Sequence, residues 1–205
     1  MIQFLQTFAE HAQEHPEWVA IIDCDGGRRT SYKELDDFSG RIAAYLKSLG
    51  IKKDSLVAIA LEKGMEFVAV QMAVIKCGAA FVPLSKSIGE ERIQFVLKDC
   101  EPDLIFDNDH LGQTMNFEPL PMTEWADSGE HDFAFIFYTS GSTGSPKGVV
   151  EEYGAYRFIL AGGANEIFRP YCVHGEKLIF ANIVPSTFFR IHSDDCGYVA
   201  FGQNL

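Results

Sequence analysis

The strongest constraint on the fold is an alternation of strand-like and helix-like apolar segments along residues 1–107. Residues 55–61, SLVAIAL, form a continuous apolar run, which predicts a strand buried on both faces. The following segment, MEFVAVQMAVIKCG, is apolar nearly all round a helix, which is typical of a helix covered on several sides. The order repeats as a strand in AAFVPL, an amphipathic helix in GEERIQFVLKDC and a strand in DLIFD. Strands that alternate with helices predict βαβ units, and therefore an α/β fold with a mostly parallel sheet flanked by helices.

The segments before this alternation carry their own start and stop signals. IQFLQTFAEHA has the apolar spacing of a helix, which Pro16 would end. Residues 18–32 favour a strand, an Asp-Gly-Gly turn at 25–27 and a returning strand. Ser31 and Glu34 form a capping-box pattern, so we expect a helix from there to Gly50.

The remainder of the chain is less regular. Residues 108–132 are polar, contain two prolines and have no clear period, so we expect a connecting loop there. FAFIFY, at 133–138, predicts another buried strand, and 151–161 has helical spacing. KLIFANIV predicts a strand, whereas the final fifteen residues favour irregular structure. We therefore expect a first α/β subdomain at 1–107, a connection at 108–132 and an incomplete second subdomain at 133–205.

Charge and cysteine content exclude several classes of partner. The 205 residues carry a formal charge of −12 without a basic stripe, so neither nucleic acid nor an anionic membrane is an expected partner. The N-terminus lacks the pattern of a signal peptide, and no stretch reaches the roughly 18 apolar residues of a membrane span. Five cysteines without a CxxC pair, three of them in or beside apolar segments, favour a reducing compartment. The expected location is the cytoplasm.

The segment YTSGSTGSPKGVV, residues 138–150, has the composition of an anion-binding loop. Its glycines free the backbone for close approach to a ligand, and successive N–H groups can then form a nest for an anion: Gly141, Gly144 and Gly148. Neutral donors come from Thr139, Ser140, Ser142 and Thr143, and Lys147 adds a mobile charge suited to phosphate. The order Pro-Lys-Gly excludes a Walker A loop. We expect the loop between a strand and a helix, where open parallel sheets bind ligands; a flexible linker is the alternative.

This loop resembles the phosphate-binding signature of the adenylate-forming superfamily, which includes acyl-CoA synthetases, adenylation domains of nonribosomal peptide synthetases and firefly luciferase. Every position of Thr-Ser-Gly-Ser-Thr-Gly-x-Pro-Lys-Gly is present at 139–148. TSYKEL at 30–35 and KCGAAFVPLSKSIGEERIQFVLKDCEPDLI at 76–105 resemble two further family elements in the right order. The latter looks more like amino-acid-activating members than fatty-acid ones. The resemblance covers residues 1–155 and implies the first half of the large N-terminal domain of these enzymes.

The resemblance also implies a chemistry. In this family a carboxylate attacks the α-phosphate of ATP, which gives an acyl-adenylate and pyrophosphate, and a thiol then takes the acyl group. ATP and Mg²⁺ are the implied cofactors, an amino acid is the implied carboxylate, and a carrier protein or coenzyme A is the implied acceptor. Lys147 would stabilise the leaving pyrophosphate. The implied phosphate-binding residues are Thr139, Ser140, Gly141, Ser142, Thr143, Gly144, Lys147 and Gly148.

Later motifs of the family are missing from the sequence. It contains no Tyr-Gly-x-Thr-Glu, no Thr-Gly-Asp and no lysine after Lys177, and Ser85 stands where the family usually has Asp. We therefore expect no complete catalytic set in this chain. One hypothesis is the N-terminal part of an adenylate-forming ligase, completed by a C-terminal chain or a homo-oligomer. The other is a truncated, non-catalytic relative that binds nucleotide or a carrier protein.

Three smaller features have competing interpretations. A C-x-H…H-x-x-x-C pattern has the ligand types of a zinc site, but is interpreted as two unrelated pairs: Cys172, His174, His192 and Cys196. Lys76 is expected to complement a helix dipole rather than to catalyse. DNDH at 107–110 is interpreted as turn chemistry, and Glu90 with Glu91 as the acidic start of a helix.

Overall fold

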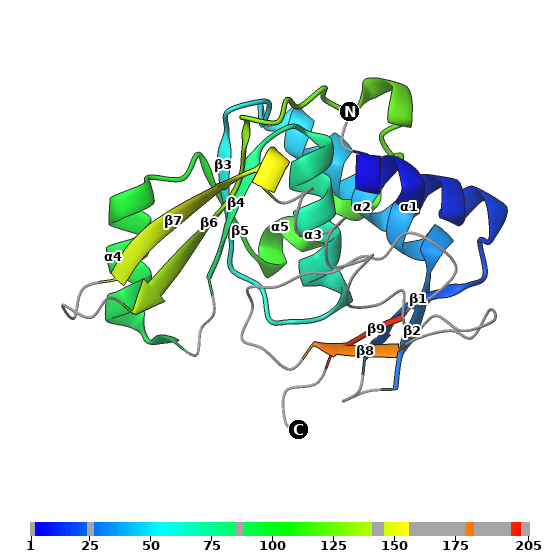
Figure 1. Cartoon of the computed structure of the whole chain (residues 1–205), viewed down its shortest axis with the longest axis horizontal. Helices are drawn as coiled ribbons and strands as arrows, with labels where there is room; N and C mark the ends of the chain where they lie inside the picture. The colour runs from blue at the N-terminus through cyan, green and yellow to red at the C-terminus, as the bar shows by residue number, and fades with distance from the viewer. Residues whose placement is uncertain are drawn as a thin grey trace.

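A computed structural model of the chain describes residues 3–23, 27–84, 88–140, 146–155, 179–182 and 198–201 (Figure 1). The described strands form a five-stranded sheet in the order β5-β3-β4-β6-β7 and a four-stranded sheet in the order β2-β1-β9-β8. In the larger sheet β3, β4, β5 and β6 run parallel, and β7 is antiparallel to β6. The predicted α/β fold with a mostly parallel sheet is therefore confirmed. The strands of this sheet are β3 (Leu56–Ile59), β4 (Ala80–Pro83), β5 (Leu104–Phe106), β6 (Phe133–Ser140) and β7 (Pro146–Glu152).

Helices cover both faces of the five-stranded sheet. One face meets α2 (Tyr32–Ser48) and α3 (Met65–Lys76), with α1 (Gln3–Glu14) outside them, and the other meets α4 (Glu90–Cys100) (Figure 1). Alternate strand residues point to opposite faces, so Val57, Ile59, Phe81 and Phe135 join the large core with α2 and α3. Ala58, Val82 and Leu84 join Val96 of α4 in a smaller cluster. None of the helices in the described part of the chain has the length and hydropathy to cross a bilayer.

The local signals at α2 and α3 behave as predicted. The Ser31 hydroxyl accepts from the Glu34 N–H at 3.2 Å, and the Glu34 carboxylate accepts from the Ser31 N–H at 2.7 Å, which completes the capping box. Gly50 follows the end of α2 with a φ of +89°. Every residue from Phe67 to Lys76 is buried, which confirms a helix covered on all sides.

The smaller sheet joins the two ends of the chain. Its strands β1 (Val19–Asp23) and β2 (Arg29–Ser31) are the predicted antiparallel pair, and β8 (Ile179–Asn182) is the predicted strand in KLIFANIV. The expectation of irregular structure in the final fifteen residues is wrong, because β9 (Tyr198–Phe201) lies there. β9 pairs in parallel with both β1 and β8, so its conformation depends on partners distant in sequence.

The polar segment expected as a connecting loop contains short helices and is firmly attached. It holds α5 (Asn108–Gln113), η2 (Thr114–Asn116) and η3 (Met122–Glu124). Residues 117–126, here called the strap, lie across α2 and α3: the Phe117 carbonyl accepts from Arg41 at 2.6 Å, and the Leu120 N–H donates to Gly40 at 3.0 Å. The Ala126 N–H donates to the Lys76 carbonyl at 2.9 Å. β6 then enters the same sheet as β3 to β5, and the division into 1–107, 108–132 and 133–205 stays a prediction.

Gly78 lies beneath the strap and is expected to be sensitive to substitution. Its φ is +71°, and an added Cβ would lie 2.7 Å from Ala126 Cβ and 3.2 Å from Ser128 Oγ. Gly78→Ala should lower the free energy of unfolding by about 2–4 kcal/mol, from the left-handed backbone and the overpacking together. Gly50→Ala is the matched control, because its φ is +89° but its Cβ would meet nothing within 4 Å. Equal losses in urea denaturation would mean that the strap does not restrict Gly78.

Candidate functional site

The glycine-rich loop lies at the tip of a hairpin formed by β6 and β7. The paired residues nearest the tip are Tyr138 with Gly148, Thr139 with Lys147, and Ser140 with Pro146. The structure therefore brings Thr139 and Lys147 face to face across the two strands. Four predicted site residues, Gly141, Ser142, Thr143 and Gly144, lie outside the described residues.

The expectation that a helix directly follows the loop is wrong. β7 extends through Glu152, and residues 153–155 are helical, while 156–161 lie outside the described part of the chain. Val149 pairs with Phe137 and Val150 with Ile136, so β-branched residues continue the ladder instead of starting a helix. The loop thus connects two antiparallel strands, although it still follows the carboxyl end of a parallel strand.

The hairpin projects beyond the rest of the sheet. Phe135 of β6 pairs with Phe81 of β4. The pairing between β6 and β7 continues farther, to Ser140. The prediction of a fully buried strand at 133–138 is correct for Ala134 and Phe135 but wrong for Phe133, which is 58% exposed. The apolar edge expected beyond this strand is covered by β7.

The electrostatics of the hairpin suit an anionic ligand. Lys147 and Thr139 are both exposed. Cross-strand partners point to the same face, so the ammonium and the hydroxyl lie on one side of the hairpin. Among the residues that the structure describes, no carboxylate forms an ion pair with Lys147. A cation without an internal partner beside a hydroxyl fits phosphate oxygens.

The described residues contain no candidate site for a divalent metal. Within the described ranges, His, Cys, Asp and Glu side chains nowhere gather in a group of three or more that could hold a metal ion. Mg²⁺ is commonly bound through substrate phosphates together with few protein groups, so the described residues are compatible with Mg²⁺ carried by a nucleotide. The four residues of the zinc pattern, Cys172, His174, His192 and Cys196, lie outside the described residues.

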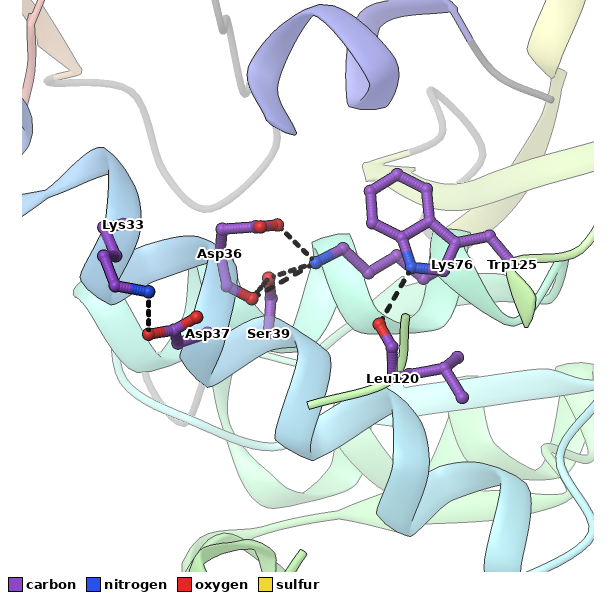
Figure 2. Close-up of polar contacts among 7 residues, drawn as sticks. All are labelled: Lys33, Asp36, Asp37, Ser39, Lys76, Leu120 and Trp125. Atoms are coloured by element: carbon purple, nitrogen blue, oxygen red, sulfur yellow. Dashed lines mark hydrogen bonds and ion pairs between the residues drawn. The ribbon is translucent and has the colours of Figure 1, made fainter. Parts of the chain in front are cut away.

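Lys76 has a different environment from the one predicted. It is 1% exposed, and its ammonium contacts Asp36 Oδ1 and Ser39 Oγ of α2, each at 2.8 Å (Figure 2). It also lies 4.6 Å from the centre of the Trp125 ring, whose indole N–H donates to the Leu120 carbonyl at 3.2 Å. Burial lowers the pKa of Lys76, and the neighbouring Asp36 carboxylate opposes that shift. Lys76 therefore links α3 to α2 and the strap, a role that dipole reasoning missed.

DNDH at 107–110 starts a helix, which corrects its interpretation as turn chemistry, whereas the interpretation of Glu90 and Glu91 holds. Asp107 is the N-cap of α5, and its carboxylate accepts from the backbone N–H groups of Asp109 and His110. A hydrogen bond from the His110 ring is the main reason why the pKa of Asp107 is lowered. Glu90 and Glu91 occupy the first turn of α4, as expected.

The sequence matches the model of one protein family, described as "AMP-binding enzyme", over residues 8–185. That match covers most of the chain. The chain belongs to the AMP-binding enzyme family.

Named relatives in this family are peptide synthases. The chain is 35% identical over 189 residues to bacitracin synthase 3 of Bacillus licheniformis, and the match covers 86% of this chain and 3% of that protein. It is 33% identical over 161 residues to tyrocidine synthase 3 of Brevibacillus parabrevis, with coverage of 71% and 2%. The chain thus spans a small part of these AMP-binding relatives.

Solved structures agree on the fold. The N-terminal subdomain of Klebsiella oxytoca NpsA, in complex with 3-hydroxyanthranilyl-AMSN, matches with a TM-score of 0.76 at 24% identity. The match covers 95% of this chain and 52% of that one. The N-terminal domain of FACL13 from Mycobacterium tuberculosis matches with a TM-score of 0.74 at 22% identity, over 89% of this chain and 51% of that one. The fold is therefore that of about half of an AMP-binding N-terminal subdomain.

Proposed function

We propose that this chain is the N-terminal part of an ATP-dependent ligase that activates a carboxylate as an acyl-adenylate. The observation that carries the proposal is the exposed Lys147 opposite Thr139 at the base of the glycine-rich loop, within a chain of the AMP-binding family. The carboxylate oxygen bonds to the α-phosphorus of ATP, the bond from that phosphorus to the bridging oxygen breaks, and pyrophosphate leaves.

The loop residues would share the binding of the triphosphate. Lys147 would pair with the charge that accumulates on the departing pyrophosphate, and Thr139 and Ser140 would donate hydroxyl hydrogen bonds to phosphate oxygens. Ser142 and Thr143 would add donors, while Gly141 and Gly144 leave backbone N–H groups accessible. Mg²⁺, when bound with ATP, would neutralise part of the phosphate charge. Gly148 lies opposite Tyr138, and an added Cβ at Gly148 would lie 3.2 Å from Tyr138 Cζ, so this glycine also makes room for the tyrosine ring.

The relatives support a proposal for the substrate and the partners. Peptide synthases are the named relatives, which supports an amino acid as the carboxylate. A carrier protein is the favoured acceptor, because a matching structure is an artificially fused adenylation–PCP didomain, and coenzyme A is the alternative. A complementary C-terminal chain or a second copy would supply the missing catalytic groups. Cysteine usage supports a cytoplasmic location.

A non-catalytic nucleotide-binding or carrier-binding module is the second candidate. The observation in its favour is that the exposed Lys147 opposite Thr139 is suited to bind phosphate whether or not a carboxylate is activated.

ATP–pyrophosphate exchange by the 205-residue chain, with Mg²⁺ and pooled amino acids, separates the candidates. Calorimetric titration with ATP is run in parallel. Exchange would show that the chain activates a carboxylate unaided. Binding of ATP without exchange would favour the non-catalytic module or a separate catalytic half. A folded chain that binds neither ATP nor pyrophosphate would contradict the phosphate site itself.

A further inference from the structure

The outer half of the hairpin needs support from outside the sheet. Beyond Phe135 the described residues of β6 pair with β7, so residues 136–140 and 146–150 form a two-stranded ribbon. Ile136 and Phe137 at its base still pack against the hydrophobic clusters. An isolated two-stranded ribbon is at best marginally stable in water. A loop that must present Lys147 and Thr139 in a fixed arrangement therefore requires a further contact near its base.

Tyr138 supplies such a contact. Its hydroxyl donates a 2.6 Å hydrogen bond to Asp99 Oδ2 near the end of α4. Its ring packs against the small cluster around Val96, beside Ile136 of the same strand. Burial and the bond to Asp99 raise the pKa of Tyr138, so the hydroxyl stays protonated and donates throughout the neutral pH range. Tyr138 directly precedes Thr139 in β6, and its hydrogen bond to Asp99 attaches this part of the strand to α4.

Gly148 provides the space for this arrangement. An added Cβ at Gly148 would lie 3.2 Å from Tyr138 Cζ and 3.3 Å from Ile136 Cγ2, so the tyrosine ring lies directly over the glycine. Tyr138 and Gly148 are cross-strand partners and share the face toward α4. The next pair, Thr139 and Lys147, points to the opposite face. The contact with α4 therefore holds the hairpin from behind and leaves the two phosphate-binding side chains accessible.

We infer that Tyr138 and Asp99 form a positioning pair that fixes the phosphate-binding hairpin on α4, with Gly148 as the space that admits the tyrosine ring. This inference rests on the proposed function, because it assigns the pair to the same site. Neither side chain is proposed to touch the phosphates. Loss of the bond should free the ribbon and weaken phosphate binding, while the core of the protein stays intact.

The test compares Tyr138→Phe, Asp99→Ala and Asp99→Asn in the full 205-residue chain. Calorimetry measures affinity for ATP and pyrophosphate, and hydrogen exchange measures the backbone amides of 147–150. Tyr138→Phe and Asp99→Ala should each weaken binding about three- to tenfold and speed exchange in the hairpin. Asp99→Asn should restore both, because its amide oxygen still accepts the bond. The double variant Tyr138→Phe/Asp99→Ala should be no worse than either single one.

The control is Tyr45→Phe, which removes a hydroxyl of α2 that has no hydrogen-bond partner among the described residues. It should change neither measurement. If Lys147→Ala weakens binding of ATP and pyrophosphate but Tyr138→Phe and Asp99→Ala do not, the positioning role is overturned. The proposed phosphate site would then still stand. Failure of the wild-type chain to bind either ligand would overturn the site and the pair together.

Discussion

Replacing Lys147 with alanine is expected to weaken binding of ATP and pyrophosphate about 10- to 100-fold. The estimate follows from the roughly 1.5–3 kcal/mol that hydrogen bonds to charged groups contribute. Lys147 is exposed and has no ion-pair partner in the described part of the chain, so its removal breaks no internal contact. The free energy of unfolding should therefore change by no more than about 0.5 kcal/mol. Calorimetric titration and urea denaturation measure the two quantities.

A matched control separates local contact from overall charge. Lys52→Ala also removes one positive charge from an exposed position of a chain whose net charge is −12. Lys52 lies before β3, next to Lys53, whose ammonium pairs with Asp132, directly before β6 at the end opposite the loop. Lys52→Ala should lower affinity less than about twofold, because exposed charges beyond a Debye length are screened. If both variants weaken binding equally, general repulsion by the acidic chain explains the loss, and Lys147 does not bind phosphate directly.

Much of the fold was predictable because its signals are local. Ser31 and Glu34 mark the start of α2 by the spacing of two side chains, and the structure contains both bonds of the capping box. The unbroken apolar composition of α3 requires cover on every side, and the structure supplies it. The loop proposed to bind phosphate was selected from composition and resemblance, because glycines, hydroxyls and a lysine together suit an anion.

The hairpin itself was not predictable from local pattern. Val149 and Val150 take an extended conformation through their pairing with Phe137 and Ile136, and that pairing joins two antiparallel strands instead of a strand and a helix. Residues 151–161 have helical spacing, so the sequence predicts a helix from 151, whereas β7 continues to Glu152. Tyr138 was treated only as a strand residue, since its bond to Asp99 joins positions far apart in the sequence. A tyrosine directly before the loop, opposite a glycine, was the available signal.

The environment of Lys76 was missed for a related reason. A lysine at a helix end usually reaches solvent, and only the position of α2 shows that it meets Asp36 and Ser39. The strap that covers Lys76 has no hydrophobic period. It is attached through its backbone, because the carbonyls of Phe117 and Glu124 accept hydrogen bonds from the side chains of Arg41 and Lys47. Attachment through the main chain leaves no trace in side-chain pattern.

Removing the partner of Lys76 is expected to have a large effect on stability. Asp36→Ala leaves the ammonium of a lysine that is 1% exposed with only Ser39, a carbonyl and the face of Trp125 (Figure 2). Loss of one member of a buried ion pair should lower the free energy of unfolding by about 3 kcal/mol. Lys76→Met keeps most of the side-chain volume and removes the buried charge. Its decrease in the free energy of unfolding should therefore be well below that of Asp36→Ala. The double variant should recover stability relative to Asp36→Ala.

The stability of the Asp36→Ala variant should depend on pH through the ionisation of Lys76. Burial already holds the pKa of Lys76 below 10.5 in the folded protein, and without Asp36 the pKa falls further. Between the folded pKa and the unfolded value of 10.5, the unfolded chain binds more protons, so stability increases as pH rises through that window. Urea denaturation from neutral pH toward 10 should therefore show Asp36→Ala regaining stability relative to wild type, and Asp36→Ala/Lys76→Met should lack that gain. A constant difference between Asp36→Ala and wild type across this range would mean that the lysine is already solvated, and the pair would then not hold the strap on α2 and α3.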